Sequence, residues 1–528
     1  MRKTLAFVTL LFTASAPALA QATNPGQPLR LTVDDAVQLA LDHNVNLAVA
    51  RLDPQIGDTR VAAAAGTFKP SLNTGVLRNN QLQPPASLLL PVATRNDVVT
   101  SSLGVGQSLP RWGTSYNLSW NSSHTDSNSF LNSYNPLITS GLGLTVSQPL
   151  LKNFLVDTPR TQLKVAQINR DITDTRLRES EVQTIADVKS AYWNLVSAHA
   201  SVEARQTSLQ LAEELARVNH VKVEVGQSPP LDEVSAQAEV ASDQEQLIIA
   251  ETGVRLAEDR LRMLIFDPTD LPIWNVVIDP VDTPPDATTA VDLDAAVSRA
   301  LDSRTDIARA KKDVETAQVN VKLADNQRLP DVRVAAGYQT AGLGGTEIIR
   351  SGGFPGTVVG PGIGTPFSTI LNQLVTNQYP TWTAGVSLSY PLGHSVQDAD
   401  YARTELERKQ SAERVKTTEA QAIQQVRTMG WNIEMNARRI ETTRAARALA
   451  EQRFDAERKR FDVGMSTSFL VIQAQRDLTQ ARTNELSAVL AYDLALVQFD
   501  AVQQAPPSVT AAVTAVNTGA TAIPGTTP

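Results

Sequence analysis

The side chains that most often bind metals are sparse and scattered in this sequence. It contains five histidines and no cysteine. A zinc site would need several such ligands at paired spacings, and these histidines have none. They are His43, His124, His199, His220 and His394. We therefore predict no metal site, and we interpret His199, near a packed helical stripe, as a packed or solvated helix residue.

Other residue patterns that could support chemistry are also weak. The glycine-rich run Gly360–Gly364 has no Lys-Ser/Thr after it and no strand-helix frame, so a phosphate-binding loop is not predicted. The carboxylates are spread through helical segments with basic residues nearby, which is typical of solvated helix faces. No nucleophile, base and acid form a recognisable set. We predict no catalytic residue, no cofactor and no enzyme activity.

Charge argues against nucleic acid as a partner. The chain has a formal net charge of −8, whereas nucleic-acid-binding domains are usually basic. The basic run Arg458-Lys459-Arg460 is interpreted mainly as a solvated face of a helix. Without cysteines, the chain has no disulfide framework and no thiolate site.

The N-terminus predicts export. Arg2 and Lys3 precede an apolar stretch at residues 5–16, and Ala18-Leu19-Ala20 offers small residues before a cleavage point. This pattern is typical of a signal peptide, here residues 1–20. No later stretch has the 18 or more apolar residues of a membrane helix, so we expect the exported chain to be soluble or a β-barrel. Aromatic residues make up only 5%, and the remaining composition is typical of long helices.

The elements occur twice along the chain. Thr32–Leu41 reads TVDDAVQLAL and Asp292–Leu301 reads DLDAAVSRAL. Further matches support a duplication: Asp34 with Asp294, Asp42 with Asp302, Pro70 with Pro330, Trp193-Asn194 with Trp431-Asn432, Leu211-Ala212 with Leu449-Ala450, and Val225-Gly226 with Val463-Gly464. Internal repeats of this kind indicate two copies of one structural unit.

Each copy is predicted to have the same order of elements. The first copy, 21–266, contains short helices, strands at about 70–149 and a long helical hairpin at 160–266. A Pro-rich linker at 267–291 leads to the second copy, 292–503, with a helix at 292–328, strands at about 331–391 and a hairpin at 394–503. Residues 504–528 form a low-complexity tail. Thr32 is predicted to cap the first helix with Asp35, and Pro54 to kink or break it.

The long helices are too long for a compact domain. No proline interrupts residues 160–228, and apolar residues recur at three- and four-residue steps from Val182 to Val202. Roughly 65 helical residues at about 1.5 Å each extend close to 100 Å. Such a rod suits a protein that bridges a distance, for example across a periplasm.

The segments between the helices alternate apolar and polar residues. Trp382, Val386 and Leu388 alternate with Thr383, Gly385 and Ser387, and similar patterns occur around residues 72–76, 142–146 and 332–338. Such strands are typical of membrane β-barrels, although half-exposed strands of a soluble sheet alternate too. We predict four membrane strands. An extra hairpin is predicted at about 101–122, and the sequence does not decide whether it belongs to the barrel wall or to a surface loop.

Four strands cannot close a barrel, because the smallest single-chain barrels use eight. Three chains would give twelve strands around a lumen. The predicted fold is therefore mainly α with transmembrane β: long antiparallel helical hairpins forming a coiled-coil tube, with four strands per protomer and a 12-stranded barrel in a trimer.

At this point the sequence resembles the TolC-like outer-membrane efflux protein family. The resemblance rests on the two openings DDAVQLAL and DAAVSRAL, on the strand ends Ser147–Leu150 and Ser389–Leu392, and on the turn Arg460–Thr467. It covers about Leu31 to Phe499. It implies a homotrimer in contact with outer-membrane lipid, a helical tube in the periplasm, and docking to a periplasmic adaptor and an inner-membrane pump.

The resemblance also implies candidate site residues. Adaptor docking is expected at the hairpin tips, which are Val225, Gly226, Gln227 and Ser228 in the first copy and Val463, Gly464, Met465 and Ser466 in the second. Glycine at these turns fits any tight reversal, so an ordinary turn remains the alternative. A periplasmic gate is expected at Asp232 and Glu233. These acids equally suit the N-terminus of the helix after Pro230, and residues 466–473 of the second copy carry no charged counterpart.

We predict a passive export channel subunit of a tripartite efflux system, present in the outer membrane. Two alternatives stay open at this stage. The chain could be the outer-membrane component of type I protein secretion. It could instead be a secreted filament or surface-layer subunit, which would not need the repeated alternating strands.

Overall fold

The computed structural model describes residues 28–85, 92–284, 291–353, 356–393 and 395–507. The chain divides into two units. The first unit contains Glu179–Arg304 together with the chain up to Ala50 and from Ala422 onward; the second contains Arg51–Arg178 and Thr305–Gln421. Each unit therefore takes segments from both copies of the repeat. The predicted signal peptide and residues 508–528 of the predicted tail lie outside the described residues.

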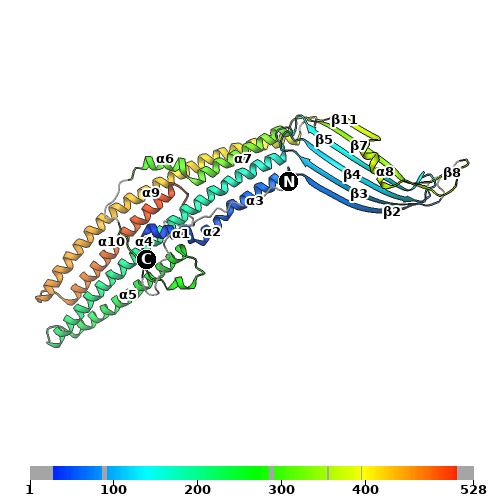
Figure 1. The fold of residues 1–528 in the computed structure, drawn as a ribbon. Helices are drawn as coiled ribbons and strands as arrows, with labels where there is room; N and C mark the ends of the chain where they lie inside the picture. Colours follow the sequence, from blue (N-terminus) through cyan, green and yellow to red (C-terminus); the bar gives the residue numbers. More distant parts are fainter. Residues whose placement is uncertain (1–27, 86–91, 285–290, 354–355, 394, 508–528) are drawn as a thin grey trace, which may run out of the picture. The chain divides into compact units, whose positions relative to one another are not determined.

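The second unit is built on one antiparallel sheet (Figure 1). Its six long strands lie in the order β2-β3-β4-β5-β7-β11. Their bounds are Ser71–Gln83, Thr94–Ser108, Ser115–Ser127, Tyr134–Pro149, Asp331–Glu347 and Tyr379–Ser389. A short strand, β10 (Ile363–Gly364), pairs with the end of β7, and β8 (Arg350–Ser351) pairs with β9 (Thr357–Val358). The mixed class of long helices and membrane strands is as predicted.

The number of strands is larger than predicted. The segment at 101–122 lies in β3 and β4, which run between β2 and β5 in the sheet, so this chain contributes six long strands and not four. The evidence is the continuous backbone pairing of β3 and β4 with their neighbours. Thirteen residue pairs join β2 to β3, and another thirteen join β3 to β4. The extra hairpin is part of the wall, and three copies would bring eighteen strands in place of the predicted twelve.

Register also separates the two faces of the sheet. One row crosses all six strands with apolar side chains: Leu72, Val105, Leu118, Leu144, Tyr338 and Trp382. The next residue of each strand belongs to a row on the other face, which is polar or small: Asn73, Gly104, Ser119, Gly143, Gln339 and Thr381. Alternation along a strand sends neighbours to opposite faces, so the sheet has one apolar and one polar face.

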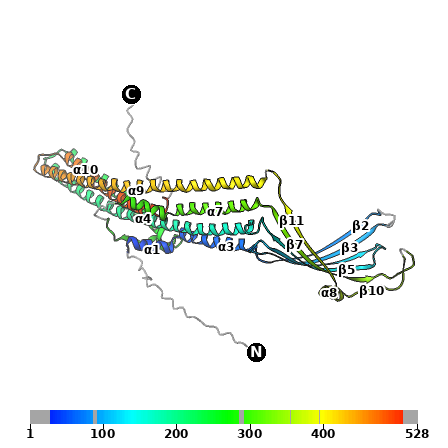
Figure 2. The same cartoon turned by 90° about the horizontal axis from the view of Figure 1, so that it is seen from above.

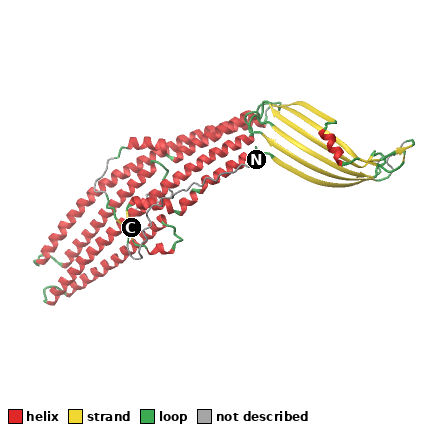
Figure 3. Cartoon of the chain, viewed as in Figure 1, coloured by secondary structure: helices red, strands yellow, loops and turns green. Residues whose placement is uncertain are grey.

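A short helix, α8 (Phe367–Val375), lies against the sheet at β7 and β5 (Figure 3). Its Ile370 is fully buried. A Cβ at Gly344 would lie 2.8 Å from the Ile370 side chain, and a Cβ at Gly342 would lie 2.6 Å from its carbonyl oxygen. The two glycines of β7 therefore allow the helix to approach the strand closely.

Helices of the second unit are linked by ion pairs. They are α3 (Leu52–Gly66), α7 (Thr305–Gln327), and the parts of α4 (Thr158–Glu224) and α9 (Val396–Asp462) in this unit. Arg170 on α4 contacts Asp58 on α3 at 2.9 Å, and Arg328 contacts Asp398 on α9 at 2.8 Å. These pairs are largely exposed and individually weak.

The first unit holds the hydrophobic cores. It contains α1 (Val33–His43), α2 (Val45–Ala50), α5 (Pro230–Ile265), α6 (Leu293–Ser303), α10 (Ser468–Val502) and the remaining parts of α4 and α9 (Figures 1 and 2). One buried cluster packs around Tyr192 and Leu261 in the first copy, and a second packs around Ile433 and Tyr492 in the second copy. No described helix is long and apolar enough to cross a membrane.

The helix starts confirm one prediction and correct another. Thr32 caps α1, and the Asp35 backbone N–H and side chain complete the predicted capping box. The break expected at Pro54 occurs instead at Asn44 and Arg51, which separate α1, α2 and α3. Pro54 lies in the first turn of α3, where its missing N–H removes no helical hydrogen bond.

The segment predicted as a linker is partly structured. It contains a 3-10 turn at Leu271–Asn275 and strand β6 (Ile278–Pro280), which pairs in parallel with β1 (Leu29–Leu31). Ile278 is fully buried in the core of the first copy. This pairing fixes the start of the first copy to the segment that leads into the second.

Candidate functional site

Two helical turns of the first unit share one backbone design. Val225–Ser228 connects α4 to α5, and Val463–Ser466 connects α9 to α10. Gly226 has φ +72° and Gly464 has φ +79°. The N–H of Gln227 donates to the Lys222 carbonyl at 2.7 Å, and that of Met465 donates to the Arg460 carbonyl at 2.7 Å. A left-handed glycine with this bond is the usual way to end a helix.

The tips present apolar side chains to solvent. Val225, Val463 and Met465 are 60%, 71% and 78% exposed. A Cβ on either tip glycine would meet no described atom within 4 Å. The turn chemistry explains the glycines, but it does not explain an exposed valine at each tip or the exposed methionine at the second tip. Such side chains are suited to packing against a partner.

The two tips are joined to one another. Lys222 Nζ, in the last turn of α4, donates to the Phe461 carbonyl at 3.0 Å and lies 3.5 Å from the centre of the Phe461 ring. Asn219, fully buried, donates to Ser468 Oγ at 2.6 Å. A small apolar cluster packs beneath these contacts: Leu215, Phe454, Phe461, Val471, Ile472, Ala474 and Leu478. The pair of turns thus forms one surface.

The predicted acids lie at the start of α5. Asp232 and Glu233 are in its first turn, after Pro230. Glu233 contacts His220 Nδ1 at 2.9 Å and accepts a hydrogen bond from Gln237 at 3.0 Å. Acidic side chains at this position interact favourably with the helix dipole. Their local role as helix-terminal acids is therefore visible in this chain.

A stronger charged contact lies farther from the turn. Arg476 on α10 pairs with Glu239 on α5 through Nε and Nη2, with distances of 3.0 and 2.5 Å. Glu239 is buried, and the guanidinium of Arg476 has a raised pKa because it bonds to Glu239. Burial and the neighbouring Glu239 raise the pKa of Asp243 one turn along α5. This cluster links the two hairpins.

Sequence reasoning did not find Lys222, Phe461, Glu239 or Arg476. Lys222, Glu239 and Arg476 belong to long helices full of similar charged residues, and nothing in their local pattern marks them. Phe461 lies inside the turn motif Arg460–Thr467, but the sequence assigned it no contact. The alignment of the two copies already paired the two tips as repeat equivalents. The contacts between them, however, depend on how the hairpins pack.

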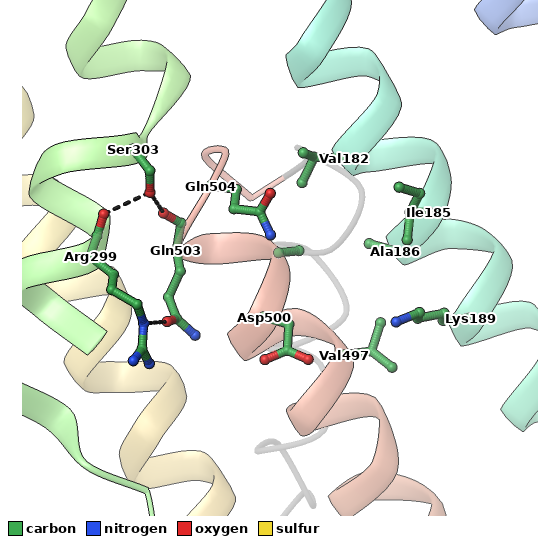
Figure 4. A pocket seen from close by; sticks show the side chains of 11 residues that line it. Val182, Ile185, Ala186, Lys189, Arg299, Ser303, Val497, Asp500, Gln503 and Gln504 are labelled. Carbon is green, nitrogen blue, oxygen red and sulfur yellow. Dashed lines mark hydrogen bonds between the residues drawn. The ribbon is translucent and has the colours of Figure 1, made fainter. Parts of the chain in front are cut away.

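A cavity of about 460 Å³ lies between α4, α6 and α10 (Figure 4). Arg299 Nε donates to Gln503 Oε1 at 2.9 Å, and Ser303 Oγ donates to the Gln503 carbonyl at 3.0 Å. Lys189 and Asp500 bring opposite charges to its walls. In the described part of the chain, no group of three His, Cys, Asp or Glu residues is arranged to hold a metal ion.

Several solved structures of membrane proteins share this fold. CusC matches with 15% identity, a TM-score of 0.64, and coverage of 90% of this chain and 92% of the other. The CmeC outer membrane channel of Campylobacter jejuni matches with 14% identity, a TM-score of 0.63, and coverage of 92% and 88%. VceC of Vibrio cholerae matches with 16% identity, a TM-score of 0.62, and coverage of 89% and 96%. At these identities the likeness concerns the fold.

Sequence comparison with curated proteins found no match. The family model of the outer membrane efflux protein matches residues 102–265 and 296–502. These ranges include both hairpins, both tips and most of the sheet, and together they cover well over half of the chain. The chain belongs to the outer membrane efflux protein family.

Proposed function

We propose that three copies of this chain assemble into one passive export channel, with their sheets closing a single barrel in the outer membrane and their helices lining a duct in the periplasm. The observation that carries the proposal is the pair of open sheet edges. Among the described strands, β2 has a neighbour only on its β3 side, and β11 pairs only with β7. Each backbone amide left unpaired in lipid would cost several kcal/mol.

Exposure of the edge strands supports closure between copies. Leu72 and Val76 of β2 are 68% and 75% exposed, and Trp382 and Val386 of β11 are 75% and 72% exposed. All four lie on the apolar face of the sheet. Pairing β11 of one copy with β2 of the next would make the apolar face continuous around the outside of the barrel, where it would contact lipid. The polar face would then line the lumen.

The hairpin tips are proposed to dock a periplasmic adaptor, which in turn connects to an inner-membrane pump. The exposed apolar residues Val225, Val463 and Met465 support this role, as does the contact between Lys222 and Phe461 that joins the two tips. Energy for transport would come from these partners.

The periplasmic end is proposed to be gated by charged residues near the tips. Asp232 and Glu233 remain candidates for an acidic ring. The Arg476–Glu239 pair supports a second element, a latch between the two hairpins, because opening the duct at this end would require α5 and α10 to separate. The signal peptide at residues 1–20 is proposed to direct the chain to export.

Purification in detergent tests the channel. We expect a trimer by mass and discrete conductance steps after insertion into a planar bilayer. A monomeric particle that stays in solution without detergent would contradict the proposal.

A further inference from the structure

The hairpin β3–β4 is a built-in part of the membrane wall. It lies between β2 and β5, with thirteen register pairs on the β2 side and eleven between β4 and β5. Its apolar residues continue the rows of its neighbours: Val105 and Leu118 stand between Leu72 and Leu144. A loop folded over the surface would have neither this register nor this alternation.

The turn of this hairpin is fixed at the helical end of the sheet. Trp112 and Gly113 have positive φ values of +61° and +67°. Gln148 Nε2 donates to the Trp112 carbonyl at 2.8 Å. A Cβ at Gly113 would lie 2.4 Å from the Asn153 carbonyl, so the turn is packed tightly against the segment between β5 and α4. Arg160 donates to that same carbonyl at 2.7 Å. The extra hairpin is therefore held at its end as well as along its sides.

We infer that the trimer closes an 18-stranded barrel with a wide, nearly uncharged lumen, so that the outer-membrane end of the duct admits bulky solutes and selects little by charge. This inference rests on the proposed trimer. Barrel diameter grows with strand number. With strands about 4.8 Å apart and tilted by about 40°, eighteen strands give a backbone diameter of about 36 Å, whereas twelve give about 24 Å.

The lining follows from the register. Three rows on the polar face cross all six strands, and their residues are Gly, Ser, Thr, Asn and Gln, with one Ala and one Tyr. None of them is charged. Short side chains that project about 5 Å into the lumen would leave about 25 Å free in an 18-stranded barrel. On the same face nearer the helices, Asp331 and Arg333 pair with each other at 2.8 Å.

The absence of cysteine from the sequence makes a direct test simple. Ala341→Cys places one nitroxide label per chain on the polar face of β7, at an exposed position. In a trimer, pulsed spin-resonance spectroscopy should report one distance. Before the label arm is counted, that distance is about 31 Å for eighteen strands and about 21 Å for twelve. The difference of about 10 Å does not depend on the length of the arm.

Deleting Thr94–Ser127 in the same labelled chain removes β3, its turn and β4. The variant should trimerise with a distance shorter by about 10 Å, and if it fails to fold, the distance in the full-length chain still decides. A full-length trimer with the shorter distance would overturn the wide barrel and leave the channel proposal standing. A monomer, or a dimer closing twelve strands, would overturn both.

Discussion

Asn44 and Arg304 occupy equivalent positions in the two copies and make equivalent contacts. Asn44 Nδ2 donates to the Leu264 carbonyl at 2.9 Å, near the end of α5. Arg304 Nη1 donates to the Val502 carbonyl at 3.0 Å, at the end of α10. Asn44 is 4% exposed and Arg304 is 1% exposed. In each copy, a buried polar side chain after the first helix therefore fastens the end of the last helix.

Replacing Arg304 with methionine should destabilise the protein clearly. Arg304 Nη2 also donates to Gln425 Oε1 at 2.8 Å. The substitution would leave the buried Val502 carbonyl without this donor, at roughly 1–3 kcal/mol, and the partly buried Gln425 amide oxygen without it at a smaller cost. We expect a lower midpoint when loss of helical circular dichroism is followed during heating. The control is Arg438→Met, which removes an exposed pair with Glu434 and should cost less than about 1 kcal/mol. Equal midpoints for the two variants would refute the structural role of Arg304.

Breaking the latch should make the channel leak. In Arg476→Met the buried Glu239 loses its partner, which favours separation of α5 from α10. We expect a higher resting conductance in planar bilayers and greater sensitivity of cells to large antibiotics. Arg453→Met is the matched control, because Arg453 pairs with Asp477 within the second hairpin, at 3.1 Å. If both variants conduct like the parent protein, the pair has no gating role.

A bulky residue at the second tip should block export. Gly464→Trp adds a large side chain in open space and strains the turn locally, because φ is +79°. Trimers should still reach the outer membrane, because the added side chain meets no described atom, while export is lost. Gly464→Asn is the control, since asparagine tolerates positive φ and adds little bulk; it should retain export. The readouts are trimer content of outer-membrane fractions and accumulation of an exported dye. Normal export by the tryptophan variant would remove the case for docking at this tip.

The carboxyl of Asp493 on α10 should make stability depend on pH. Burial raises its pKa from 3.8 to about 7. The folded state then binds a proton more tightly than the unfolded chain, so stability is highest below the unfolded pKa and falls as pH rises toward the folded one. At about 1.4 kcal/mol per pH unit, the loss approaches about 4 kcal/mol as an upper bound.

Asp493→Asn removes this dependence. The variant should unfold at a higher temperature than the parent near pH 8, by calorimetry of the detergent-solubilised protein, and at nearly the same temperature near pH 4. Asp500→Asn, at an exposed position of the same helix, serves as the control and should follow the parent at both values. If the variant is no more stable than its parent near pH 8, ionisation of the Asp493 carboxyl does not destabilise the folded protein, and the prediction is wrong.

Much of the fold could be predicted because its signals are periodic and repeated. The alternation around Trp382 and the long proline-free stretches reflect local backbone geometry, which can be recognised from the sequence alone. The number of strands could not be settled in the same way. Leu103 to Trp120 alternates as well as the other strands, but only the register with β2 and β5 shows that it joins the wall.

Prediction of the site was weaker for a related reason. Gly226 and Gly464 mark the turns, because few residues other than glycine adopt positive φ readily. The contacts of Lys222 with Phe461, and of Arg476 with Glu239, join residues far apart in the chain. Their partners are set by packing between hairpins, which leaves no trace in local spacing.

The β5–β7 ladder joins the last strand of the first copy to the first strand of the second. The proposed junction between chains, β11 to β2, joins the last strand of the second copy to the first strand of the first. In both pairings the last strand of one copy lies next to the first strand of the following copy. A closed ring would therefore repeat one kind of strand pairing six times, alternately within a chain and between two chains. The ancestor of this protein is then best pictured as a half-length chain that formed a six-membered ring, later fused in pairs.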